Sequence, residues 1–96
     1  MPRPRKRRRI GCEPDYNRFG PKGIPIQGSI NLTLEELETI KLIDLNNMTQ
    51  EECAKSMGVA RTTVTSIYND ARRKIATAII EGKTLIIEGG NYIISK

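Results

Sequence analysis

Histidine is absent from this chain of 96 residues, and cysteine occurs only as Cys12 and Cys53. Two thiols without an imidazole argue against both a disulfide framework and a zinc site. Three features argue against catalysis. The commonest general base, histidine, is absent, and no nucleophile stands in a recognisable motif. We also expect the acidic residues on exposed helix faces. The sequence therefore predicts a protein that is not an enzyme and that binds neither metal nor cofactor. We expect Cys53 in the helix packing and Cys12 as a free thiol.

Long apolar runs are also missing. No stretch approaches the ~20 residues that a membrane span requires, and no apolar stretch follows the basic N-terminus as it would in a signal peptide. We therefore expect a cytoplasmic protein with no membrane partner. The length allows one small domain, and small domains bury a modest fraction of their surface, so oligomerisation is a plausible aid to stability.

Acidic residues are missing from the start of the chain, which carries six of the sixteen basic residues: Arg3, Arg5, Lys6, Arg7, Arg8 and Arg9. The remainder holds ten basic and eleven acidic residues, a net charge of −1, so the whole excess of +5 comes from this segment. We expect residues 1–10 to form a disordered basic arm. Such an arm is either a solvated tail or a DNA contact that reaches phosphates or the minor groove.

The most informative stretch that is present runs from residue 49 to residue 69, TQEECAKSMGVARTTVTSIYN. Thr49 and Glu52 form a capping box at the start of a helix, and Gly58 can take the left-handed conformation that ends it. Ala54 is small enough for a second helix to pack closely, and that helix begins near Arg61 and ends at Gly82. The apolar contacts between the two helices are expected from Cys53, Met57, Val59, Val64 and Ile67. The spacing predicts a DNA-binding helix-turn-helix, with an ordinary helical hairpin as the alternative.

A further helix precedes this motif. Thr33 and Glu36 form a second capping box, and Asn46 and Asn47 end the helix. Its apolar residues recur at steps of three: Leu34, Leu37, Ile40 and Ile43. Three helices in this order form the core of a helix-turn-helix domain, here residues 33–82, and their spacing resembles region four of sigma factors.

The flanking segments predict extended structure. Residues 11–32 are rich in proline and glycine, and their apolar residues Ile24, Ile26, Ile30 and Leu32 share one parity, so we expect an edge strand or irregular coil. Residues 83–96, KTLIIEGGNYIISK, predict a β-hairpin around Gly89 and Gly90. A lone hairpin is marginally stable, so its apolar side chains must pack against another part of the protein. Three candidates are the segment around Ile24 to Leu32, the long helix and a second copy of the chain. We favour a two-fold homodimer with the hairpin at its interface.

The sequence thus predicts a mainly α fold, a three-helix helix-turn-helix domain with a C-terminal β-hairpin and a disordered basic N-terminal arm. The residues expected on the outer face at the start of the last helix are Ala60, Arg61, Thr62, Thr63, Thr65, Ser66 and Asn69. Arg61 suits guanine or a phosphate, and Asn69 suits adenine. We expect Thr65, Ser66 and Asn69 at base edges, and Arg72, Arg73 and Lys74 against the DNA backbone or in solvent.

These residues predict a sequence-specific protein that binds double-stranded DNA and regulates transcription. Two alternatives remain open. A sigma-like domain can also bind RNA polymerase or an anti-sigma partner, through an acidic face on the first two helices formed by Glu35, Glu36, Glu38, Asp44, Glu51 and Glu52. The arginine-rich arm could instead bind structured RNA.

Several segments together resemble one known family: PRPRKRRR, NRFGPKGIP, LTLEELETIKLIDL, QEECAKSMGVARTTV, ARRKIA and IEGGNY. They are similar to domain of unknown function family 134, small prokaryotic proteins described as predicted DNA-binding proteins. The resemblance covers nearly the whole chain and implies the same sigma-like helix-turn-helix. The chain departs from the usual pattern at Ala60, where such motifs commonly carry a serine. Losing that cap costs ~1 kcal/mol of helix stability unless Thr62 or Thr63 replaces it.

Overall fold

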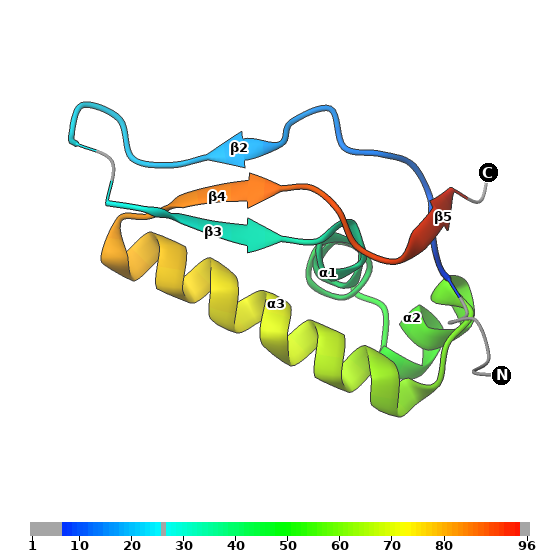
Figure 1. Ribbon diagram of the computed structural model, residues 1–96. Coiled ribbons are helices and arrows are strands. Elements are labelled where there is room, and N and C mark those ends of the chain that lie inside the picture. The colour runs from blue at the N-terminus through cyan, green and yellow to red at the C-terminus, as the bar shows by residue number, and fades with distance from the viewer. Residues whose placement is uncertain (1–6, 26, 95–96) are drawn as a thin grey trace, which may run out of the picture.

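The helices of the computed structural model, which describes residues 7–25 and 27–94, lie where the sequence predicts them (Figure 1). Helix α1 (Leu34–Thr39) continues into a π-helical segment η1 (Ile40–Leu45), and α2 (Gln50–Met57) is followed by the long α3 (Arg61–Glu81). Both predicted capping boxes are confirmed. The backbone nitrogen of Glu36 donates to the Thr33 hydroxyl at 3.2 Å, and that of Glu52 donates to the Thr49 hydroxyl at 3.1 Å.

Glycines end α2 and α3 as expected. Gly58 and Gly82 have φ values of 68° and 67°, a left-handed conformation that a residue without a Cβ adopts at little cost. Ala60 precedes the first turn of α3, and no side-chain hydrogen bond caps that turn. Neither Thr62 nor Thr63 therefore replaces the missing serine.

Five strands form two small sheets. Strand β4 (Thr84–Ile87) is the centre of a three-stranded sheet, with β2 (Arg18–Phe19) antiparallel on one side and β3 (Ser29–Leu32) parallel on the other. Strand β1 (Arg8–Ile10) pairs in parallel with β5 (Tyr92–Ile94). Figure 1 shows α3 lying along the three-stranded sheet, with α2 and the β1–β5 pair at the far end of the molecule.

The predicted C-terminal hairpin is wrong, although both of its strands exist. Strands β4 and β5 belong to different sheets because the chain between them is held by the start of α1. The backbone nitrogen of Leu34 donates to the Gly89 oxygen at 3.0 Å, and that of Asn91 donates to Glu35 Oε1 at 2.6 Å. Both edges of β4 are then paired by other parts of the same chain. Pairing with β3 covers β4 by the segment around Ile24 to Leu32, one of the three possibilities that the sequence leaves open. Ile26 of that segment lies outside the described residues.

The expectation of a disordered arm is wrong for its last three residues. Arg8–Ile10 form a strand, and Ile10 is only 2% exposed in the hydrophobic core. Burial of this one isoleucine and the pairing with β5 anchor the segment. Residues 1–6, with Arg3, Arg5 and Lys6, lie outside the described part of the chain.

Two clusters of buried side chains share α3. The first joins the sheet, α1 and α3, and consists of Ile10, Leu32, Leu34, Ala71, Ala78, Leu85 and Ile87. The second joins η1, α2 and α3, and consists of Leu42, Cys53, Ala54, Met57 and Val64. The expected place of Cys53 in the helix packing is confirmed. Because both clusters include residues of α3, its orientation is fixed at both ends. Within the described residues, no helix is apolar over enough of its length to cross a bilayer.

Candidate nucleic-acid interface

The start of α3 presents an exposed polar face beside α2. The turn between the two helices consists of Gly58–Ala60, and the buried Val64 and Tyr68 hold the opposite side of α3 against the core. Arg61, Thr62, Ser66 and Asn69 are exposed, as is Ala60. Steps of three and four residues place Thr62, Ser66, Asn69 and Arg73 on one side of the helix. Most of the predicted outer face is therefore available to a partner.

Thr65 differs from the expectation, because its hydroxyl is already used within the protein. It contacts the side-chain oxygen of Gln50 in α2 and lies 3.1 Å from the backbone oxygen of Arg61. Thr65 and Thr63 are half-buried. Thr65 thus links the two helices. Among the described residues, the exposed side chains of Ser66 and Asn69 have no hydrogen bond, so their polar groups are available to a partner.

The basic residues farther along α3 fall into two groups. Lys74 lies 2.7 Å from the buried Glu36, and Arg72 lies 3.7 Å from Asp44, with its guanidinium 5.3 Å above the ring of Tyr68. Tyr68 donates a hydrogen bond of 2.6 Å to the same Asp44 carboxylate, and this bond raises the pKa of Tyr68 above its usual range. Arg61 and Arg73 are exposed and have no ion pair within the described residues. Among the described residues of this face, Arg61 and Arg73 are therefore the cations available to bind an anionic partner.

The backbone N–H groups in the first turn of α3 form a candidate anion-binding site. The initial N–H groups of a helix have no partner inside it, and Ala60 supplies no side-chain acceptor. Uncapped N–H groups together with the helix dipole favour an anion such as a phosphate. The exposed Arg61 stands at the same place and increases the positive potential there.

The basic segment reaches this region from the other end of the chain. Arg8 lies 3.3 Å from Glu35 and is half-buried, and its buried Nε has no hydrogen-bond partner. Arg9 is exposed, and its Nη2 donates to the backbone oxygen of Lys55 at the end of α2 at 3.0 Å. The sequence predicts both arginines in the basic arm, which is either a solvated tail or a DNA contact. No local pattern pairs them with residues 27 and 46 positions away, so these contacts could not be foreseen.

Three acidic residues of α1 are buried, contrary to the expectation of exposed acids. Glu35, Glu36 and Glu38 are only 8%, 7% and 6% exposed. Each has a cationic partner, respectively Arg8, Lys74 and Lys41, at 2.7–3.3 Å. Each also accepts a backbone N–H, from Asn91, Thr33 and Gly11 respectively.

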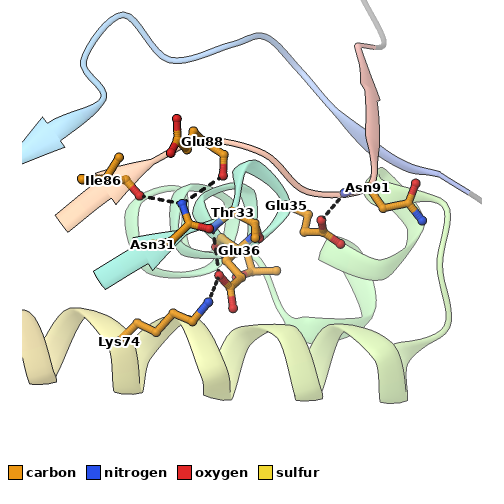
Figure 2. Close-up of polar contacts among 9 residues, drawn as sticks. Asn31, Thr33, Glu35, Glu36, Lys74, Ile86, Glu88 and Asn91 are labelled. Carbon is orange, nitrogen blue, oxygen red and sulfur yellow. Dashed lines mark hydrogen bonds and ion pairs between the residues drawn. The ribbon is translucent and has the colours of Figure 1, made fainter. Parts of the chain in front are cut away.

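These carboxylates tie the start of α1 to its neighbours, as Figure 2 shows for Glu35 and Glu36. A buried carboxylate is tolerated when it is paired and hydrogen-bonded in this way. The acidic face proposed for a polymerase contact is thereby reduced to the exposed Asp44, Glu51 and Glu52.

A separate hollow of about 490 Å³ lies between α3, β2 and β4. Apolar side chains form most of its wall, among them Phe19, Leu37, Ile75 and Ile79, with Lys83 as the charged member. No acidic side chain is among the described residues that line it. In the described residues, no three cysteine or acidic side chains gather where they could hold a metal ion.

The fold and this face define a small protein of three helices and two small sheets with a partly basic helical surface. The chain belongs to the family described as protein of unknown function DUF134, whose model matches residues 1–95. A UPF0251 protein of Desulfitobacterium hafniense (strain Y51) is 54% identical over 94 residues, which cover 96% of this chain and 75% of the relative. A UPF0251 protein of Halothermothrix orenii is 48% identical over 98 residues, which cover all of this chain and 73% of the relative. No solved structure matches the chain. The family suggested by the sequence motifs is confirmed.

Proposed function

We propose that this protein binds double-stranded DNA sequence-specifically and regulates transcription. In this proposal α2 and α3 form a helix-turn-helix of the sigma region-four type, and the start of α3 enters the major groove. The observation that carries it is the division of α3 into two sides. One side is fixed by Val64 and Tyr68, whereas the other presents polar groups without an internal partner.

Each free group on that side has a use on DNA. Asn69 can pair bidentately with adenine, Ser66 can bond to either edge of a base pair, and Arg61 can grip guanine or a phosphate. The uncapped first turn of α3 suits a backbone phosphate, and Arg73 suits another farther along the helix. Arg3, Arg5, Lys6 and Arg7 supply further positive charge. This function needs no catalytic group and places the protein in the cytoplasm with the DNA.

Selection of bound sequences from a random pool of duplexes tests this proposal. We expect a consensus whose affinity falls steeply with salt, because binding releases counterions from the phosphates. Asn69→Ala should then cost ~1–3 kcal/mol on the best site and relax the base preference there. Asn17→Ala, which removes an exposed amide just before β2, is the matched control and should change nothing. Absence of any enriched duplex, or tighter binding to structured RNA, would remove the proposal.

We further propose that the protein acts as a homodimer. The hairpin that first suggested one does not form, so the proposal now rests on exposed apolar side chains, two of which, Phe19 and Ile79, line the hollow. Ile79 and Ile80 of α3 are 72% and 82% exposed, and Phe19 and Ile24 are about half exposed. A symmetric dimer that covers them would present two copies of α3 to a palindromic site.

A further inference from the structure

The guanidinium of Arg9 covers the turn between α2 and α3. Its Nη2 donates to the Lys55 carbonyl in the last turn of α2 at 3.0 Å. A Cβ built on Gly58 would lie 2.8 Å from Arg9 Nε and 2.9 Å from its Nη2. Gly58 has the positive φ that favours glycine, and the guanidinium of Arg9 lies where a side chain at this position would begin.

Strand β1 holds Arg9 in this place. It pairs with β5, with Arg9 opposite Ile93, and side chains alternate between the two sides of a strand. Arg8 and Ile10 point toward α1 and the core, where Arg8 meets Glu35 and Ile10 is buried. Arg9 points the other way, onto the end of α2. The two neighbours thus fix the position from which Arg9 reaches the turn.

The end of α2 is a favourable place for a cation. The last carbonyls of a helix lack partners inside it and carry the negative end of the dipole. The Lys55 oxygen accepts from the Gly58 nitrogen at 3.3 Å as well as from Arg9. A guanidinium that lies on the turn and bonds to this carbonyl restrains the residues that connect α2 with α3.

We propose that Arg9 is a positioning residue, which fixes the α2–α3 turn and thereby sets the orientation of α3 relative to α2. Its consequence for base selectivity rests on the proposed DNA-binding function. Arg9 then differs in kind from Arg7, which is exposed and has no ion pair or side-chain hydrogen bond within the described residues. Arg7 contributes only charge.

The variants Arg9→Gln and Arg7→Gln separate the two roles, because each removes one positive charge from the same basic segment. Spin labels on Ser56→Cys and Asp70→Cys report the distance between α2 and α3 in a Cys12→Ser background, since Cys53 is buried and both labelled positions are exposed. We expect a broader distance distribution in Arg9→Gln and an unchanged one in Arg7→Gln. Arg9→Lys, which keeps the charge and one donor, should be intermediate and serves if Arg9→Gln fails to fold.

Duplex binding by the unlabelled variants supplies the second readout. Arg9→Gln should lower the ratio of specific to nonspecific affinity by about tenfold, the effect of misplacing one base contact. Arg7→Gln should weaken both affinities by the same factor. A distance distribution in Arg9→Gln like that of the unchanged chain overturns the inference, and so does an unchanged affinity ratio despite a broader distribution. If the unchanged protein selects no duplex, the proposed function fails, and the distance distribution alone decides the role of Arg9.

Discussion

Glu36 joins three parts of the structure through one carboxylate. Its Oε1 accepts from the Thr33 nitrogen at 2.9 Å and lies 2.7 Å from Lys74 Nζ of α3, while its own nitrogen donates to the Thr33 hydroxyl (Figure 2). The sequence predicted the bond to Thr33, because a capping box involves residues three positions apart. The pair with Lys74 spans 38 positions and has no local signal.

Glu36→Ala should therefore destabilise the protein more than a helix cap alone accounts for. We expect a loss of about 2–4 kcal/mol, because the substitution removes the cap and leaves the ammonium of Lys74, which is partly exposed, without its partner. Urea unfolding measures this loss. Glu51→Ala is the control, since Glu51 is an exposed acid in the first turn of α2 and should change stability by at most about 0.5 kcal/mol. Equal losses in both variants would contradict the role of the buried pair.

Cys53 makes stability depend on alkaline pH. Burial, and secondly the charge of Glu38, raise the pKa of the Cys53 thiol to about 11 from its ordinary 9.0. The folded state thus holds the proton more tightly than the unfolded chain. The contribution of the protonated Cys53 thiol to the free energy of unfolding is fully present below pH 9 and is lost as the pH rises through 11.

Urea unfolding at several pH values between 8 and 11 tests this dependence. The loss over this range should be on the order of 2 kcal/mol. Cys53→Ala should reduce the slope, although a part remains because the hydrogen bond to Asp44, then burial, raises the pKa of Tyr68 as well. A slope identical to that of the unchanged protein would show that Cys53 does not carry the effect.

At the scale of elements, local signals predicted the helices and long-range contacts decided the strands. The bounds of α2 and α3 follow from Thr49, Gly58 and Gly82, which act on neighbours within four positions. The segment around Gly89 and Gly90 fits a hairpin by composition. Its neighbour Asn91 bonds to Glu35, 56 positions away, and that contact turns β5 toward β1.

The sequence also predicted the local features of the candidate site but not its long-range contacts. Steps of three and four residues identified most of the exposed side of α3, because Val64 and Tyr68 mark its buried side, but Thr63 and Thr65 are half-buried. The same pattern could not show that Thr65 contacts Gln50 or that Arg9 covers Gly58. Both contacts depend on how two separate elements meet, which periodicity does not encode.

The start of α3 allows a prediction in which stability and binding change in opposite directions. Ala60→Asp supplies the missing acceptor and should stabilise the protein by ~1 kcal/mol in thermal unfolding. The same carboxylate occupies the N–H groups offered to a phosphate and repels it, so duplex affinity should fall. Ala60→Ser adds the cap without the charge and should stabilise α3 with a smaller loss of affinity. Unchanged affinity in Ala60→Asp would show that no phosphate binds at this helix end.

At the scale of the whole molecule, the exposed isoleucines of α3 have no cover within the described residues. Ile79 lines a largely apolar hollow and Ile80 follows it in α3, and exposed apolar patches commonly mark interaction sites. If two copies pack there about a two-fold axis, the starts of the two α3 helices should meet half-sites ~34 Å apart or a multiple of it.

Sedimentation equilibrium tests the dimer directly. We expect the full chain to associate at micromolar concentration and Ile79→Glu to shift it toward monomer, because a charge at the apolar contact would be buried without a partner. Ile94→Glu is the matched control on β5, where the hairpin interface was first expected and where the side chain is about 40% exposed. Association lost only in Ile94→Glu would move the interface to the β1–β5 pair. A full chain that stays monomeric at high micromolar concentration would rule the dimer out and leave each α3 to bind a single half-site.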